Sequence, residues 1–140
     1  MSAIFLDLCE KYKFMCQVKE YKSTGHICFY IQNINPVLIK KNFKEIIKFI
    51  LLSNKKALEI SNKYDKKLFC THIYLENARA ENFNLSLFKK IIKELNNQGN
   101  CDILDTIYIY GGSTFIQKIY NIVKIFLNPE TRKKILFVNR

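Results

Sequence analysis

The chain has 140 residues, and its 23 Lys and Arg residues against 12 Asp and Glu residues give a formal net charge of +11. This length allows one domain with a sizeable core, and a composition of 49% hydrophobic and 25% charged residues excludes a disordered protein. The charge favours a polyanionic partner such as nucleic acid, an anionic membrane surface or a phosphorylated ligand. Coding from AT-rich DNA, which enriches Lys together with Asn and Ile, explains the positive charge equally well.

The first 24 residues predict a short helix followed by a turn. Ser2 has the residue type of a helix cap, and Ile4, Leu8 and Tyr12 recur at helical spacing after it. The polar segment 19–25 is typical of a turn. The apolar run 26–31 that follows it indicates a strand buried on both faces.

From this strand to the end of the chain, helices and strands alternate. Asn35 and Pro36 have the residue types of a helix N-cap and first helical position, and a helical period runs over 43–58. The further predicted elements are strands at 68–75, 106–110 and 135–138 and helices at 85–95 and 114–127. This alternation predicts right-handed crossovers and an α/β fold whose mainly parallel sheet has about four or five strands. We expect a single domain over residues 1–140, with its α/β core in residues 25–140.

The cysteines and the hydropathy pattern bear on the compartment. The five cysteines are Cys9, Cys16, Cys28, Cys70 and Cys101. Their odd number and scattered spacing predict buried free thiols rather than disulfides or a zinc site, and we expect no metal and no other cofactor. The sequence does not begin with a secretory signal, and its best apolar run, 46–52, is too short to span a bilayer. We therefore expect a cytoplasmic protein whose contact with membranes is peripheral.

Residue patterns of common catalytic sites are missing from the sequence. Ser113 follows two glycines, but the order is not G-x-S-x-G. His26 and His72 fall inside predicted strands, where histidines of the sheet are more common than catalytic bases. We therefore expect that the protein is not an enzyme. The lysine pairs are dispersed rather than interleaved with exposed aromatic residues, which argues against a specific nucleic-acid groove.

The most specific stretch of the sequence lies near its C-terminus. An apolar strand leads through Gly111 and Gly112 into a helix that is apolar over most of its surface, and a basic run follows Pro129. Such a helix must be buried or must face lipid. The order of elements, and above all the residues KIFLNPET at 124–131 with Lys134 and Ile135, resemble the CRAL-TRIO lipid-binding domain family. Members of that family carry phosphatidylinositol, tocopherol or retinoids.

Weaker parts of the resemblance extend over residues 25–138. The segment Gly25-His26-Ile27 takes the place of a Gly-Arg-Pro turn before the family's first strand. The strand that runs into Tyr74-Leu75-Glu76-Asn77 is similar to the family's strand ending in Asp-Leu-x-Gly, with Tyr74 in place of Asp and Asn77 in place of Gly. Gly111-Gly112-Ser113 replaces an Asn-x-Pro motif.

The resemblance implies a lipid-binding or lipid-transfer function with two groups of site residues. The headgroup of a phosphoinositide or another anionic phospholipid would be held by Asp102, Thr131 and Lys134. The acyl chain would lie against the family's gate helix, through Phe115, Ile116, Ile119, Tyr120, Val123, Phe126 and Leu127. A simpler interpretation of the same residues is a helix packed in the core, a Thr131 that caps the turn after Pro129, and a solvated Lys134.

The expected partners are a phospholipid and an anionic membrane surface. Complete members of the family carry a helical module before this domain and a further segment after the fourth strand, whereas this sequence ends at Arg140. An apolar pocket without one wall would expose surface at a cost of about 25 cal/mol per Å². Such a pocket collapses or is covered by a second copy of the chain or by a partner protein. The alternative function is a protein-interaction module on the same fold that has lost its lipid cavity.

Overall fold

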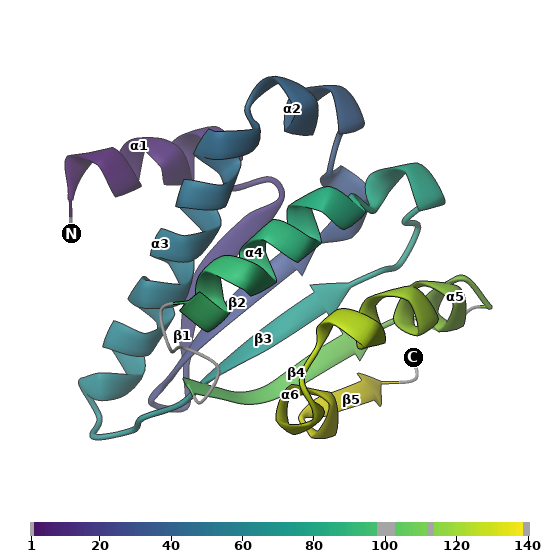
Figure 1. Ribbon diagram of the computed structural model, residues 1–140. Coiled ribbons are helices and arrows are strands. Elements are labelled where there is room, and N and C mark those ends of the chain that lie inside the picture. The colour runs from purple at the N-terminus through teal and green to yellow at the C-terminus, as the bar shows by residue number, and fades with distance from the viewer. Residues whose placement is uncertain (1, 98–102, 112–113, 139–140) are drawn as a thin grey trace.

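The computed structural model describes residues 2–97, 103–111 and 114–138, which form one five-stranded sheet with helices (Figure 1). The strands are β1 (Cys16–Tyr21), β2 (Thr24–Tyr30), β3 (Phe69–Tyr74), β4 (Leu104–Tyr110) and β5 (Ile135–Val138), in this order across the sheet. β1 and β2 pair antiparallel, and every other neighbouring pair is parallel. The predicted α/β class and the mainly parallel sheet are therefore confirmed.

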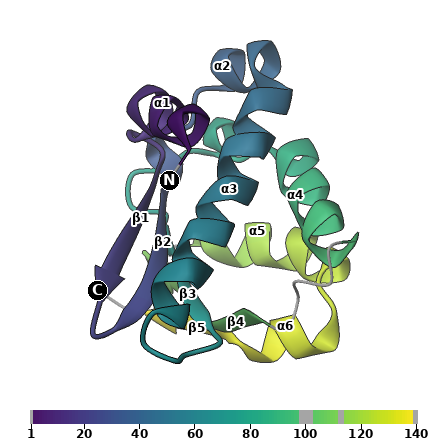
Figure 2. The same cartoon turned by 90° about the vertical axis from the view of Figure 1, so that its left-hand side faces the viewer.

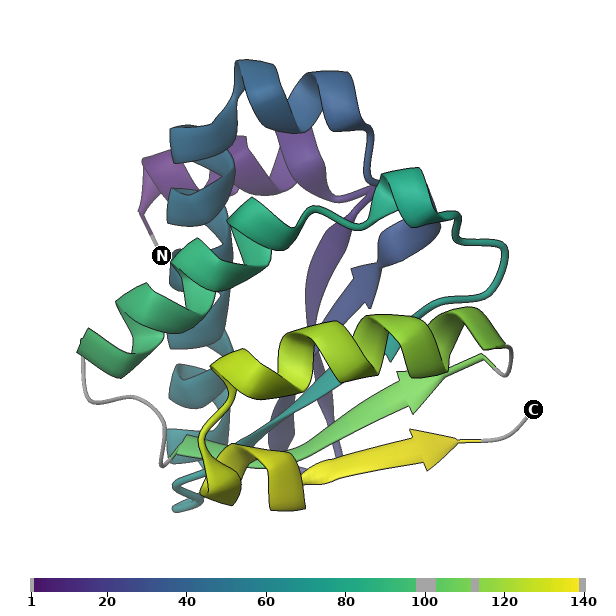
Figure 3. The ribbon, with the colours of Figure 1, turned by 45° about the vertical axis from the view of Figure 1, so that its right-hand side comes forward.

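Within the described residues, six α-helices accompany the sheet: α1 (Ala3–Tyr12), α2 (Pro36–Lys41), α3 (Phe43–Asn62), α4 (Leu85–Asn97), α5 (Thr114–Val123) and α6 (Pro129–Lys133). Short 3₁₀ turns lie at η1 (Ile31–Asn33), η2 (Ala80–Asn82) and η4 (Lys124–Phe126). Helices α3, α4 and α5 each cross between parallel strands, and all three lie on the same face of the sheet (Figures 2 and 3). The opposite face carries no helix among the described residues.

The segment 19–25, predicted as a turn, is mostly strand. Residues 19–21 complete β1, and Lys22 and Ser23 alone form the turn, with φ angles of 51° and 60°. Two consecutive left-handed residues match the twist of a two-residue hairpin. Because neither Asn-Gly nor Asp-Gly marks this turn, the sequence pattern did not reveal β1.

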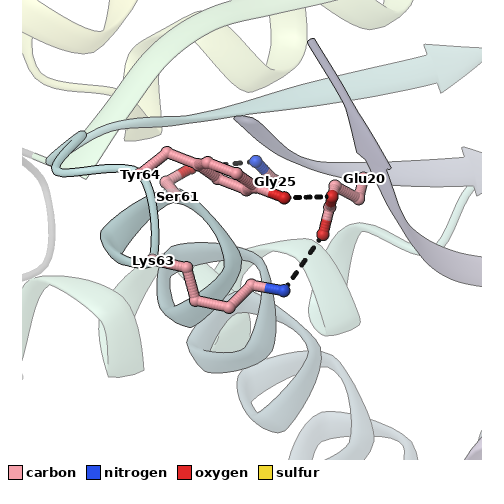
Figure 4. A network of polar contacts seen from close by, with 5 residues as sticks. All are labelled: Glu20, Gly25, Ser61, Lys63 and Tyr64. Atoms are coloured by element: carbon pink, nitrogen blue, oxygen red, sulfur yellow. Dashed lines mark hydrogen bonds and ion pairs between the residues drawn. The ribbon is translucent and has the colours of Figure 1, made fainter. Parts of the chain in front are cut away.

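Helix α3 rests directly on β2 at Gly25. A Cβ atom at this position would lie 1.9 Å from the carbonyl oxygen of Ala57, so only glycine allows the approach. The Gly25 backbone N–H also donates a hydrogen bond to Ser61 Oγ over 2.9 Å (Figure 4). The contact is buried and fixes the distance between α3 and the sheet.

Glu20 joins β1 to the C-terminal end of the same helix. Its carboxylate accepts hydrogen bonds from the Tyr64 hydroxyl over 2.6 Å and from Lys63 Nζ over 3.1 Å (Figure 4). The bonds from Tyr64 and Lys63 lower the pKa of Glu20. The hairpin is therefore tied to α3 through both of its strands.

The main core lies where α1 and α3 pack on each other and on the β1–β2 side of the sheet. The ring of Phe49 on α3 lies 6.3 Å from that of Phe5 and 5.6 Å from that of Tyr12, both on α1. Tyr12 is fully buried, and its hydroxyl donates a hydrogen bond to the carboxylate of Glu45. This half of the molecule is thus closely packed, unlike the half under α4 and α5.

We predict that Gly25→Ala destabilises the fold by about 3 kcal/mol or more, because backbone atoms of α3 cannot move aside as a flexible side chain would. Urea unfolding followed by circular dichroism would measure the loss. Ser61→Ala removes the neighbouring hydrogen bond without adding volume and should cost about 1–2 kcal/mol. A Gly25→Ala protein as stable as the wild type would contradict the close contact between β2 and α3.

Candidate functional site

A cavity of about 210 Å³ lies between the sheet and the helices α4 and α5. Figure 1 shows both helices in front of strands of the sheet. The floor of the cavity is formed by side chains that alternate onto the helix face of β3, β4 and β5, namely Thr71, Ile73, Ile107, Ile109 and Ile135. Alternation along the strands therefore supplies an aliphatic floor.

The walls of the cavity come from amphipathic helices. The α4 wall consists of Leu87, Phe88, Ile91, Ile92 and Leu95, at the i, i+4 and i+8 spacing of one helix face. Helix α5 contributes Ile119, Tyr120 and Val123 from the other side, and α3 contributes Ile50 and Asn54. The space is therefore bounded by helices above and by parallel strands of the sheet below.

The polar groups of the lining are few and uncharged. Asn54 Nδ2 donates to the carbonyl oxygen of Ile50 over 2.9 Å, and Asn82 Nδ2 donates to that of Ile34 over 2.8 Å. Asn84 Oδ1 accepts the N–H of Leu87 over 2.8 Å and so begins α4. None of the lining residues that the structure describes carries a formal charge. Such a lining suits an apolar ligand and offers little for proton transfer.

The predicted gate-helix residues have different positions. Ile119, Tyr120, Val123 and Leu127 all line the cavity. The helix itself is shorter than predicted, because α5 ends at Val123 and η4 follows it.

Three further residues predicted for the gate helix do not reach the cavity or cannot be placed. Phe126 is outside the lining, and Lys89 Nζ of α4 lies 4.5 Å from the centre of its ring. This cation–π contact joins the two helical walls. The side chains of Phe115 and Ile116 fall outside the described part of the structure.

The predicted headgroup residues are placed in part. Thr131 is buried in α6 and lines the cavity. Lys134 follows that helix, is half-buried, and donates its backbone N–H to the carbonyl oxygen of Thr131 over 3.0 Å. Asp102 falls outside the described residues. Thr131 therefore lies at the end of the cavity next to β5, whereas Lys134 is outside the lining and is joined to Thr131 through the backbone alone.

The cap of the turn after Pro129 is Asn128 rather than Thr131. Asn128 Oδ1 accepts the backbone N–H of Thr131 over 2.7 Å, as an N-cap side chain does. Lys133 Nζ lies 3.8 Å from a carboxylate oxygen of Glu130, whereas no ion pair of Lys134 exists among the described residues. The two neighbouring lysines therefore differ in their local electrostatics.

Helix α5 and η4 also present apolar residues outward. Ile122 is 46% exposed and Ile125 is 66% exposed. The exposed Lys118 and the half-buried Lys124 belong to the same segment. In the described part of the chain, no helix is long and apolar enough to cross a bilayer.

Both histidines lie on the face of the sheet opposite the cavity and form a hydrogen-bonded chain. His26 Nε2 lies 3.2 Å from the Tyr21 carbonyl oxygen, His26 Nδ1 lies 2.9 Å from His72 Nε2, and His72 Nδ1 lies 2.7 Å from the Tyr110 hydroxyl. A carbonyl only accepts, so neutral His26 donates from Nε2 and accepts at Nδ1. His72 then donates from Nε2 and accepts the Tyr110 proton at Nδ1.

Sequence reasoning missed the α4 wall and the floor as parts of the site. The apolar face of α4 was predicted from its period, but that period is the same for a helix that packs on a filled core and for one that lines a cavity. Asn54, inside a long helix, carried no signal of its own. Only contact between distant segments distinguishes these residues from ordinary core.

The comparisons with known proteins agree with this geometry. Residues 11–140 match the sequence profile of the CRAL/TRIO domain. Among solved structures, the chain is similar to the crystal structure of Sfh5, with a TM-score of 0.70 and 12% sequence identity over 91% of the chain. The chain spans 50% of the length of Sfh5, and the low identity supports a common fold alone. Curated protein sequences gave no match.

The position of His72 predicts a pH-dependent stability. Burial, and then the charges of His26 and Lys19, lower its pKa from 6.5 to about 4. The stability that depends on neutral His72 is therefore fully present above about pH 6.5 and is lost as the pH falls through 4. We expect a loss of about 1–2 kcal/mol, less than the full pKa difference implies because solvent screens a half-exposed ring.

Urea unfolding of the wild type and of His72→Gln between pH 7 and pH 4 would measure this loss. The variant should be less stable at pH 7 but should change less with pH in this window. Parallel pH profiles for the two proteins would show that His72 is not the group responsible.

Proposed function

The chain belongs to the CRAL/TRIO domain family, and we propose that it binds a lipid whose acyl chain occupies the cavity between the sheet and helices α4 and α5. The cavity of about 210 Å³ with its uncharged lining carries this proposal. Each methylene group moved from water into such a space contributes about 0.8 kcal/mol. A chain of several methylenes therefore suffices for binding without any charged contact in the cavity.

We further propose that the lipid is a phosphoinositide or another anionic phospholipid. The support is the buried Thr131, which lines the end of the cavity, and Lys134, which follows three residues later at the end of α6. A hydroxyl donates a hydrogen bond to phosphate, and an ammonium group neutralises it. Asp102 is retained as the predicted acceptor of headgroup hydroxyls.

The proposed place of action is the surface of an anionic membrane, reached from the cytoplasm. Ile122 and Ile125 would enter the interface, and Lys118 and Lys124 would lie near the headgroups. A cation near such a surface contributes about 1 kcal/mol, and the net charge of +11 attracts the whole molecule to it. We propose that this surface of α5 faces membrane rather than a covering protein.

The alternative, a protein-interaction module without a lipid cavity, has less support. A module that no longer binds lipid has no reason to keep an apolar space, because an unfilled cavity forfeits dispersion contacts and destabilises the fold. The cavity beneath α4 and α5 therefore favours the lipid-binding function.

Filling the cavity should weaken lipid uptake. We expect Ile119→Trp, which adds volume on the cavity side of α5, to weaken binding of a fluorescent acyl lipid at least tenfold, since indole and acyl chain compete for one space. Ile122→Trp is the matched control, because the same change falls on the exposed side of the helix. Fluorescence titration of the purified proteins, with melting curves for each, would measure the effect. Equal uptake by both variants and the wild type would refute a ligand in this cavity.

The headgroup assignment predicts a difference between neighbouring lysines. Lys134→Ala should weaken phosphoinositide binding about ten- to a hundredfold, as expected for loss of a charge-assisted contact of about 1.5–3 kcal/mol. Lys133→Ala should cost less, because Lys133 is exposed and lies near Glu130. Thr131→Val should weaken phosphoinositide binding and spare a lipid with a different headgroup. Titration of each variant with vesicles of defined lipid composition would measure these affinities. Equally mild effects of the two lysine substitutions would refute the headgroup assignment.

A further inference from the structure

The face of the sheet opposite the helices is covered by aromatic rings. Tyr30, Tyr74 and Tyr110 lie in register on β2, β3 and β4, with ring centroids 5.3 Å and 4.6 Å apart and rings within 9° of parallel. A second row contains His72 and Tyr108, whose centroids are 5.0 Å apart. Since neighbouring strands are about 4.8 Å apart, rings at these distances stack face to face and turn their edges outward.

This aromatic face is poor in charge. Of the strand residues that alternation and register place on it, only Lys19 and Asp105 carry a formal charge, although a quarter of all residues in the chain are charged. Cys28 and Cys70 are buried on the same face, although no helix of the described part of the chain lies above them. A surface rich in tyrosine and depleted of charge has the composition of the central part of a protein–protein interface.

The two charges of the face lie at one level on opposite sides. Lys19 pairs with His26 in register, and His26 pairs with Cys70. Asp105 Oδ2 lies 3.9 Å from Cys70 Sγ. The cation is therefore on β1 and the carboxylate on β4, with β2 and β3 between them.

We propose that this aromatic face binds a second copy of the chain in an isologous dimer. A two-fold axis parallel to the strands and between β2 and β3 would place β1 of each copy over β4 of the other. Lys19 of each copy would then face Asp105 of the other, twice in the dimer, with the tyrosine rows between the two sheets. Face-to-face sheets with strands within about 30° of each other are a common packing.

The size of the face sets the expected affinity. Five strands with the usual spacing and length cover roughly 500 Å² of flat area. This is less than the roughly 800 Å² per partner of a standard stable interface. We therefore expect a dimer that dissociates in the micromolar range.

Single-stranded nucleic acid fits the face less well. In proteins that bind single-stranded nucleic acid, the bases stack on the open faces of aromatic rings, next to cationic side chains. Here the faces of the rings stack on one another, and the one lysine of the strands on this face is balanced by Asp105. A second copy uses both the ring edges and the paired charges.

Sedimentation velocity of the intact chain across the micromolar range tests the proposal. Lys19→Asp and Asp105→Lys should each raise the dimer dissociation constant at least tenfold, because like charges would then face each other. The combined variant Lys19→Asp/Asp105→Lys should restore it to within about threefold of the wild type. Glu94→Lys on α4 makes the same change of net charge as Asp105→Lys, but away from this face, and should leave the dimer intact.

Rescue by the combined variant would support the dimer and would exclude unfolding as the cause of the single effects. A wild type that stays monomeric throughout would overturn the proposal, and so would a dimer that neither single variant weakens or that the combined variant fails to restore. Oligonucleotide binding by a monomer, lost in Lys19→Asp, would instead assign the face to nucleic acid. None of these outcomes depends on the lipid cavity.

Discussion

The order of the strands across the sheet determines on which face of the sheet the helices lie. Each parallel step from β2 to β5 moves the same way across the sheet, and right-handed crossovers then place α3, α4 and α5 on one face. Doubly wound sheets reverse direction once and receive helices on both faces, but this chain does not reverse. One face is therefore available for a cavity under helices, while the other must be protected in another way.

The spacing between helices and sheet differs across the molecule, and the difference makes the cavity. At Gly25 the backbone of α3 approaches β2 so closely that no side chain intervenes, and the hairpin is tied to α3 by Glu20. Under α4 and α5 the same distance is set by isoleucines and by Tyr120, which hold the helices away from the strands without filling the space. A rigid half thus supports a half that has room for a ligand.

The sequence predicted the elements well where local chemistry specifies them. Asn35 and Pro36 begin α2 as N-cap and first residue, as their residue types predict. β1 was missed because Lys19 and Glu20 are adjacent charged residues in the strand and because its turn, Lys22-Ser23, has no glycine. The run 26–31 suggested a strand buried on both faces, because His26 and Tyr30 were counted as apolar residues. Counting them in this way hides the alternation between the two faces of the strand. A helix that lines a cavity and a helix that packs on a filled core also have the same apolar period, so the site could be recognised only in the tertiary structure.

Strands β3 and β4 serve both faces at once. Thr71, Ile73, Ile107 and Ile109 point into the cavity, and the residues between them, His72, Tyr74, Tyr108 and Tyr110, cover the other face. Because tyrosine and histidine shield a strand while keeping a polar edge toward water, the aromatic rows take the place of a second helical layer. Side chains on one face have no direct contact with ligands of the other, and the two faces share only the backbone. The hydrogen-bonded chain from Tyr110 through His72 to His26 spans three strands and holds their register, so the order of this aromatic face also maintains the floor of the cavity.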